Sequence, residues 1–257
     1  MTEDLLFERR GRIGFVTFNR PQARNAITFP MYQRLREVFE SLADEKELKV
    51  VVLTGAGDKA FAAGTDINEF RAFSTPQDAI GYEERGEEVL SLIERTPIPT
   101  IAAISGACTG GGAGIAAACD LRIATRNTRI GFPIARTLGN CLSMSNYARL
   151  AALFGMSRAK EMIFTARLLG AEEALAAGFL SEIVEDHPSL MTRATELAET
   201  VAGNAPLTLA ATKEAFRRLR EGNREGDDLV LSCFMSNDFR EGLEAFLSKR
   251  PPNWTGS

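Results

Sequence analysis

A run of three consecutive glycines is the part of this sequence best suited to chemistry by the backbone. Residues 105–115 read Ser-Gly-Ala-Cys-Thr-Gly-Gly-Gly-Ala-Gly-Ile, between an apolar run and an alanine-rich stretch. Such a turn from strand to helix directs free N–H groups and the positive helix end at one spot. It lacks the ending of a P-loop and the spacing of a dinucleotide fold, so it favours one developing oxyanion. Tight packing of helix on sheet is the weaker alternative, because successive glycines destabilise a helix.

A second loop of small residues has a similar character. Residues 60–67 read Ala-Phe-Ala-Ala-Gly-Thr-Asp-Ile and follow an apolar run that ends at Thr54. Small residues at 62–64 allow a ligand to approach the backbone, and Gly64 permits unusual dihedral angles. Asp66 is typical of the N-cap of a helix that starts near Ile67. An ordinary strand-to-helix turn explains this segment equally well, so both interpretations stay open here.

Side-chain nucleophiles and metal sites find little support. The only histidine is His187, which removes Ser-His-Asp and Cys-His triads and histidine-rich metal sites. No paired spacing connects the four cysteines, Cys108, Cys119, Cys141 and Cys233. They are therefore predicted to be reduced and intracellular rather than part of a disulfide framework or a zinc site. The remaining chemistry must use carboxylates, hydroxyls, amides or the backbone.

The composition narrows the partners and the compartment. The chain has 257 residues and a formal net charge of −4, which argues against a nucleic-acid-binding surface. No apolar run approaches the length of a membrane span. We therefore expect a cytoplasmic protein with neither a nucleic-acid nor a membrane partner.

The elements that would position these loops follow from the hydrophobic pattern. Continuous apolar runs predict buried strands, and 3.6-residue periodicity predicts helices. The expected strands are 13–18, 49–54, 98–104, 121–125 and 179–184, and the expected early helices are 31–42 and 79–93. Residues 192–257 are almost wholly helical in pattern. We thus predict an α/β core over residues 1–191 and a helical region over 192–257 that packs on the core and on neighbouring subunits.

These segments together resemble the crotonase superfamily, that is, the enoyl-CoA hydratase/isomerase family. The matching segments are 19–21, 25–26, 51–55, 60–67, 99–103, 110–112, 119–124, 171–174, 177–179, 240–242, Phe246 and 249–250. They cover nearly the whole chain in order. The resemblance implies a spiral of ββα units and a helical C-terminal region that forms a homotrimer or a dimer of trimers.

The resemblance also implies specific site residues. The N–H groups of Ala63 and Gly111 would form an oxyanion hole for a thioester carbonyl. Coenzyme A would enter as part of the substrate, with no cofactor bound permanently and no metal. Its expected contacts are Ala23, Arg24, Ala62 and Ile67, with Phe234 and Lys249 approaching the nucleotide, often from a neighbouring subunit. For Lys249, a solvated surface charge is nearly as good an explanation.

The chain departs from the family pattern at its two hydratase glutamates. The first position holds Gly114, where the triple glycine fixes the register. The second falls at Ile134, or at Ala135 with a different placement of one residue, and no Asp or Glu occurs between Asp120 and Glu161. The paired-carboxylate mechanism for water addition cannot operate with these residues.

Replacement acid–base groups must then come from elsewhere. Asn140 and Ser143 follow the missing second glutamate and could hold a water, although such loop residues are more often solvated. On the helix over 79–93, Glu84 and Glu88 share a face. A solvated acidic stripe is the favoured alternative for these glutamates.

The sequence thus predicts an acyl-CoA enzyme of the hydratase/isomerase type that stabilises a thioester enolate, acting as a lyase or isomerase. A specialised acyl-CoA hydrolase, decarboxylase or isomerase of the same superfamily is the chemical alternative. A non-catalytic acyl-CoA-binding trimer is the alternative from another class.

Overall fold

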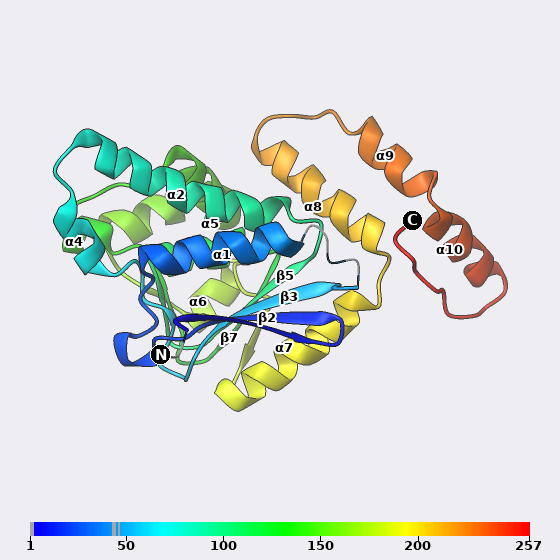
Figure 1. Ribbon diagram of the computed structural model, residues 1–257, viewed down its shortest axis with the longest axis horizontal. Coiled ribbons are helices and arrows are strands. Elements are labelled where there is room, and N and C mark those ends of the chain that lie inside the picture. The colour runs from blue at the N-terminus through cyan, green and yellow to red at the C-terminus, as the bar shows by residue number, and fades with distance from the viewer. Residues whose placement is uncertain (1–2, 43–44, 46) are drawn as a thin grey trace.

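Six strands form the larger of two sheets in the computed structural model, which describes residues 3–42, 45 and 47–257 (Figure 1). Its strand order is β1-β2-β3-β5-β7-β10, with β1 and β2 antiparallel and the others parallel. The bounds are β1 (Leu5–Arg10), β2 (Ile13–Phe18), β3 (Val50–Gly55), β5 (Thr100–Ile104), β7 (Leu121–Thr125) and β10 (Glu182–Val184). The strand predictions 13–18 and 121–125 are confirmed to the residue. The strand predicted at 49–54 is shifted by one residue, and those predicted at 98–104 and 179–184 are confirmed with shorter bounds.

A smaller sheet lies beside it with the order β4-β6-β8-β9. Its strands are β4 (Ala60–Ala62), β6 (Ala107–Thr109), β8 (Arg129–Gly131) and β9 (Leu169–Gly170). Along the chain, each of β3, β5 and β7 is followed by one strand of this small sheet and then by a helix. The chain therefore advances one position in both sheets with each unit. This topology confirms the expected spiral of ββα units.

N-capping side chains mark the starts of α1 and α2. Helix α1 begins before residue 31, because the Thr28 side chain accepts from Met31 N and Pro30 occupies the first turn. Helix α2 begins at Pro76 because Thr75 and Asp78 form a capping box. The bounds are α1 (Phe29–Ser41), α2 (Pro76–Arg95), α3 (Gly111–Ala118), α4 (Ile134–Thr137), α5 (Met144–Phe164), α6 (Ala171–Ala176), α7 (His187–Ala202), α8 (Pro206–Arg220), α9 (Asp227–Phe234) and α10 (Asn237–Leu247). Two 3-10 helices are η1 (Pro21–Ala23) and η3 (Ile67–Ala72).

The central strands β3 and β5 of the large sheet are buried on both faces, which explains their continuous apolar sequences. Side chains alternate along β3, so Val51 and Leu53 join a core that contains residues of α1, α2 and α3. Val50 and Val52 join a second core on the opposite face. That core is closed by α7 through Leu190, Ala194 and Ala198.

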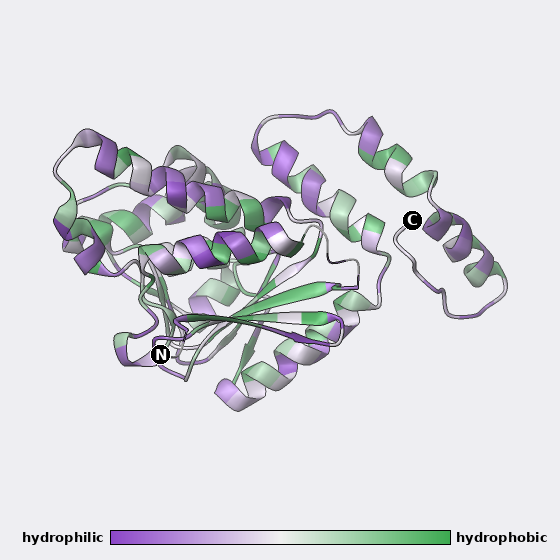
Figure 2. Cartoon of the chain, viewed as in Figure 1, coloured by the Kyte–Doolittle hydropathy of each residue, from purple (hydrophilic) through white to green (hydrophobic). Residues whose placement is uncertain are grey.

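The C-terminal helices extend away from this core. The boundary proposed after residue 191 falls within α7, and α7 packs on the large sheet. Figure 1 shows α8 lying beside α2 and leading to α9 and α10, which project beyond the sheet. Helices α9 and α10 contain hydrophobic segments, green in Figure 2, and several of their apolar side chains are exposed. They are Val230, Leu231, Phe234, Met235, Phe239, Leu243, Phe246 and Leu247. In the described part of the chain, no helix has the length and hydropathy to cross a membrane.

Candidate active site

The two glycine-containing loops meet at the wall of one cavity of about 190 Å³. The loop after β4 contributes Ala63, Gly64 and Thr65, and the turn into α3 contributes Gly110 and Gly111. Helix α2, the segment after β8 and the start of α5 supply most of the rest of the wall, and α1 and η3 also contribute. The parallel arrangement of β4 and β6 brings the two loops together, because both strands end at the same edge of the small sheet.

Backbone hydrogen bonds hold the first loop in place. Ile27 N donates to Gly64 O at 2.8 Å, and Asp66 N donates to Ile27 O at 2.8 Å. Gly64 adopts φ +97°, which only glycine tolerates readily. Asp66 caps η3 as predicted, and its pKa is lowered chiefly by the Asn68 N–H and also by Arg20. Between these anchors, the N–H of Thr65 has no acceptor among the described residues.

The choice of Ala63 as a ligand donor is corrected by this geometry. Ala63 N donates to Arg24 O at 3.1 Å, so a neighbouring turn already occupies this N–H group. Arg24 has φ 51° after η1, and its carbonyl is thereby presented to the loop. The free donor on this loop belongs to Thr65, two residues further on.

At each position of the triple-glycine turn, a different structural feature favours glycine. Gly110 adopts φ +52° with ψ −123° as the N-cap of α3. A side chain at Gly112 would overlap Ala62 O, and one at Gly111 would overlap the Tyr32 hydroxyl. Close packing thus accounts for two of the three glycines. Gly111 begins α3 and lines the cavity, and its N–H has no acceptor among the described residues.

The hydroxyls of Tyr32 and Thr65 lie beside Gly111, and the Tyr82 hydroxyl is joined to them through Thr65. Tyr32 Oη lies 3.0 Å from Thr65 Oγ1, which lies 2.8 Å from Tyr82 Oη. Burial raises the pKa of both tyrosines, so both stay protonated at neutral pH. The chain of hydroxyls fixes the Thr65 side chain beside Gly111. Sequence reasoning did not identify Tyr32 or Thr65.

The carboxylate in the cavity is Glu83, and the choice of Glu84 is corrected. Glu84 is exposed and does not line the cavity, whereas Glu83 is half-buried and does. Burial raises the pKa of Glu83, against a lowering by the Ser143 N–H and with a further rise from Glu87. The one-residue difference turns the side chain by about 100° around α2.

The segment after β8 contributes differently than its sequence suggested. The Ser143 hydroxyl caps α5 by accepting from Asn146 N at 3.2 Å, and its own N–H donates to Glu83 Oε2 at 3.0 Å. Ser143 therefore orients Glu83 rather than facing the cavity itself. Asn140 does line the cavity, with its amide 3.4 Å from Cys141 O.

Gly114 and Ile134 both line the cavity. A Cβ atom placed on Gly114 would meet Leu90 Cδ1 at 3.6 Å and Asn146 Oδ1 at 3.7 Å, which are ordinary contacts. The position therefore has room for a side chain. Ile134 is buried and adds only apolar surface.

The residues expected to contact coenzyme A lie in three places. Ala23 and Arg24 are on the turn that bonds to Ala63, and Ala62 is fully buried in β4. Ile67 lines the cavity with 61% of its surface exposed, as a residue at the rim would.

The two expected nucleotide contacts lie on the projecting helices. Phe234 ends α9, and Lys249 follows α10 with φ 52°. Neither lines the cavity of its own chain.

The cysteines give no nucleophile at neutral pH in the core. Burial raises the pKa of Cys119 to about 12 and that of Cys108 further. All four cysteines are unpaired. In the part of the chain that the structure describes, no three His, Cys, Asp or Glu side chains are grouped to hold a metal ion.

Comparison with known proteins gives a consistent result. A sequence profile described as enoyl-CoA hydratase/isomerase matches residues 8–257. The short-chain-enoyl-CoA hydratase of Clostridium acetobutylicum is 36% identical over 256 residues, covering 96% of this chain and 95% of that protein. The carnitinyl-CoA dehydratase of Citrobacter koseri is 36% identical over 265 residues, covering all of both chains.

A solved structure agrees in the fold. The crystal structure of an enoyl-CoA hydratase/carnithine racemase from Magnetospirillum magneticum superimposes with a TM-score of 0.92 at 32% identity. The match covers 100% of this chain and 97% of that one. The architecture is therefore the crotonase-like α/β fold expected from the sequence.

Proposed function

This chain belongs to the enoyl-CoA hydratase/isomerase family, and on that premise we propose that it is an enzyme that binds acyl-CoA thioesters and stabilises a thioester enolate with the N–H groups of Thr65 and Gly111. One observation carries the proposal. Thr65 and Gly111 both line one cavity, and the N–H group of neither has an acceptor among the described residues.

Two such donors are suited to an oxyanion. Backbone amides fixed by the fold need no reorganisation when negative charge develops, and removing one donor from an oxyanion hole typically costs about 3 kcal/mol of transition-state stabilisation. Gly111 lies in the first turn of α3, so the helix dipole adds to the same effect. A lysine or a metal ion is not needed for this stabilisation.

We further propose that Gly114 and Ile134 occupy the positions of the two hydratase glutamates. Neither side chain can transfer a proton, so hydration of a simple enoyl-CoA such as crotonyl-CoA is expected to be slow. An isomerase, hydrolase or decarboxylase that uses the same oxyanion hole remains an alternative reaction. A non-catalytic acyl-CoA-binding trimer remains the alternative from another class.

The exposed apolar surface of α9 and α10 supports a proposed trimer or dimer of trimers. Phe246 is 82% exposed and Phe234 is 58% exposed, although both are large and apolar. Covering such a surface with a second copy would remove it from water. Light scattering at micromolar concentration should give a trimer or hexamer, and a monomer would contradict this. The four unpaired cysteines support a proposed cytoplasmic location.

The test is a panel of acyl-CoA thioesters incubated with the purified protein and analysed by mass spectrometry. Gain of water, loss of carbon dioxide and release of free coenzyme A each identify one reaction. Binding without turnover of any thioester would support the non-catalytic alternative. Failure of every thioester to bind would overturn the proposal.

A variant of Gly111 provides the matched check on the donor. Gly111→Pro removes the N–H group and should abolish turnover. Because the new ring would also press on Tyr32, its fold must be verified by circular dichroism. Gly226→Ala, just before α9, is the control for a change of glycine outside the cavity lining, because a Cβ atom there would meet nothing within 4 Å.

A further inference from the structure

Glu83 is the only charged side chain that lines the cavity of the described chain. The other lining groups are backbone, apolar side chains, hydroxyls and side-chain amides. A carboxylate is therefore the one group in contact with the cavity that can exchange a proton near neutral pH. It belongs to α2, whereas the Gly111 turn begins α3.

One oxygen of Glu83 is fixed and the other is free. Oε2 accepts from Ser143 N at 3.0 Å, at the start of α5. Oε1 has no hydrogen-bond partner among the described residues. This arrangement orients the carboxylate while leaving an oxygen available to a bound molecule.

Among the described residues, no Lys, Arg or His lines the cavity beside Glu83. The nearby titratable groups are Glu87 on the same helix, Tyr82 beside it and Tyr32 on α1. Arg149 is engaged by Glu87 and lies outside the cavity lining. The loops that follow β4, β6 and β8 bring no ionisable side chain to the cavity. Burial consequently raises the pKa of Glu83 towards the range useful for proton transfer.

We propose that Glu83 is the catalytic base that removes a proton from the carbon next to the thioester carbonyl and returns it as an acid. This inference rests on the proposed function, because it requires a thioester oxygen at the N–H groups of Thr65 and Gly111. In the forward step the C–H bond breaks and its proton forms an O–H bond with Glu83. The electron pair becomes the carbon–carbon double bond of the enolate, and negative charge moves from the carboxylate to the thioester oxygen.

The proposed proton transfer leaves the total charge in the cavity unchanged. The cavity holds one negative charge before the step and one after it. The charge leaves a buried carboxylate that has no counter-ion and arrives at two unoccupied N–H donors. A single carboxylate can also return the proton to a different carbon of the conjugated enolate, which is a 1,3-shift. The specific expectation is therefore an isomerase-type proton transfer rather than a reaction that needs two carboxylates.

The experiment measures exchange of the α-hydrogens of butyryl-CoA with deuterium oxide, by mass spectrometry. It needs no knowledge of the natural acyl group. The wild-type protein should catalyse exchange, and Glu83→Gln should slow it by about 10²- to 10⁴-fold. Glutamine keeps the shape and can still accept from Ser143 N. Glu84→Gln, on the exposed side of the same helix, should leave the rate unchanged.

Two further measurements separate catalysis from a loss of folding. Glu83→Gln should bind butyryl-CoA with nearly wild-type affinity, so the loss should lie in kcat. Glu83→Asp should recover part of the rate. The wild-type exchange rate should fall as pH drops through the pKa of Glu83, above the usual glutamate range, and Glu84→Gln should keep that profile.

The outcomes distinguish this inference from the proposal on which it rests. Exchange by Glu83→Gln at the wild-type rate would overturn the role of Glu83 and leave the oxyanion hole intact. Binding of butyryl-CoA by the wild-type protein without any exchange would also overturn it, while acyl-CoA binding would stand. Absence of binding by the wild-type protein would overturn both.

Discussion

Glu83 and Glu94 lie on the same helix, about 16 Å apart along its axis, and have opposite environments. Glu83 lines a cavity that no described cationic side chain lines, and one of its carboxylate oxygens has no hydrogen-bond partner among the described residues. Burial raises its pKa. Glu94 is 8% exposed. Burial acts to raise its pKa too, but hydrogen bonds from Arg149 and Arg220 outweigh this and hold the pKa below its usual value.

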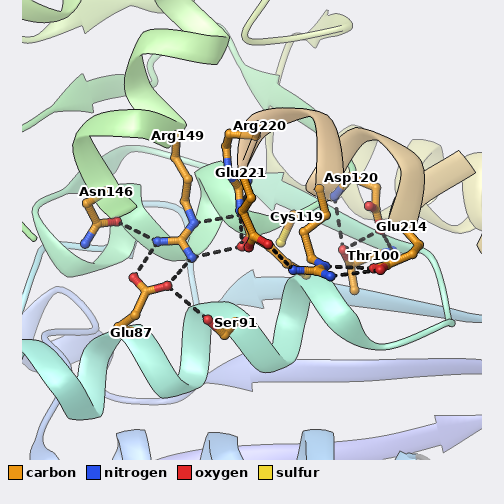
Figure 3. Close-up of polar contacts among 12 residues, drawn as sticks. Glu87, Ser91, Thr100, Cys119, Asp120, Asn146, Arg149, Glu214, Arg220 and Glu221 are labelled. Atoms are coloured by element: carbon orange, nitrogen blue, oxygen red, sulfur yellow. Dashed lines mark hydrogen bonds and ion pairs between the residues drawn. The ribbon is translucent and has the colours of Figure 1, made fainter. Parts of the chain in front are cut away.

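The surroundings of Glu94 form a saturated ion-pair network. Arg149 donates to both carboxylate oxygens of Glu94 at 2.8 and 2.9 Å, and Arg220 donates to the same two oxygens. Arg149 also donates to both oxygens of Glu87, and Figure 3 shows its guanidinium pointing toward this carboxylate. The network joins α2, α5 and α8.

The contrast separates two uses of a buried carboxylate. Glu94 has its hydrogen-bonding capacity filled by arginines, so its proton affinity is low and its role is to connect helices. Glu83 lacks that compensation, so burial raises its pKa above the usual glutamate value. Perturbed carboxylates without a counter-ion in a cavity are the ones to examine for chemistry.

The largest expected effect on stability follows Glu94→Gln. Removing one partner of a buried ion pair leaves arginine charges without compensation, at a cost of about 3–5 kcal/mol. Urea unfolding at one fixed protein concentration should show this loss. Glu83→Gln is the matched control and should be neutral or slightly stabilising. Equal losses for both variants would remove the contrast.

The changes in unfolding free energy caused by Glu94→Gln and Glu83→Gln should depend on pH in opposite directions. Glu94 has a lowered pKa, so its contribution is complete above the usual glutamate pKa and is lost as pH falls through its folded-state pKa. The cost of Glu94→Gln should therefore shrink in acid. Glu83 has a raised pKa, so its ionised form is penalised at neutral pH, and any gain from Glu83→Gln should vanish in acid. Unfolding curves across the acid range would test both, and parallel trends would contradict the assignment.

A smaller effect is expected on the cavity side. Tyr32→Phe removes the hydroxyl that contacts Thr65 Oγ1 at 3.0 Å and lies against Gly111. A hydrogen bond of this kind contributes about 0.5–1.5 kcal/mol to stability. Thermal unfolding should show a loss of that size. A loss as large as that of Glu94→Gln would mean that the hydroxyl chain, too, is a principal support of the fold.

The smallest expected effect is a gain. Gly114→Ala places a methyl group where the nearest atoms are 3.6 Å or more away, inside helix α3. Alanine is favoured over glycine in a helix by about 1 kcal/mol, so the unfolding midpoint should rise slightly. A fall would show that the cavity wall is tighter than the described contacts indicate.

The sequence predicted the frame of the molecule better than its site. Continuous apolar runs located β2 and β7 to the residue, because both strands are largely buried on both faces. The three-residue strands β4, β6 and β8 were not predicted, since so short a segment shows no periodicity. Capping at Thr75 identifies the start of α2 better than its apolar residues do.

The two corrected site residues show where sequence reasoning stopped. Glu83 lies seven residues before the buried Leu90, on one face of α2, and this spacing could have identified it. The spacing of Glu84 and Glu88 placed both on one face of α2, but that face is the exposed one. The correction from Ala63 to Thr65 had no such signal, because it depends on the Arg24 carbonyl, which arrives from a distant turn.

The most direct test of the oxyanion hole is a crystal structure with a non-reactive acyl-CoA analogue. The thioester oxygen should lie about 3 Å from the nitrogen atoms of both Thr65 and Gly111. Ala63 N should remain bonded to Arg24 O, as it is without ligand. A thioester oxygen beyond hydrogen-bonding reach of both Thr65 and Gly111, or one bound to Ala63 N after release of Arg24 O, would contradict the proposed site.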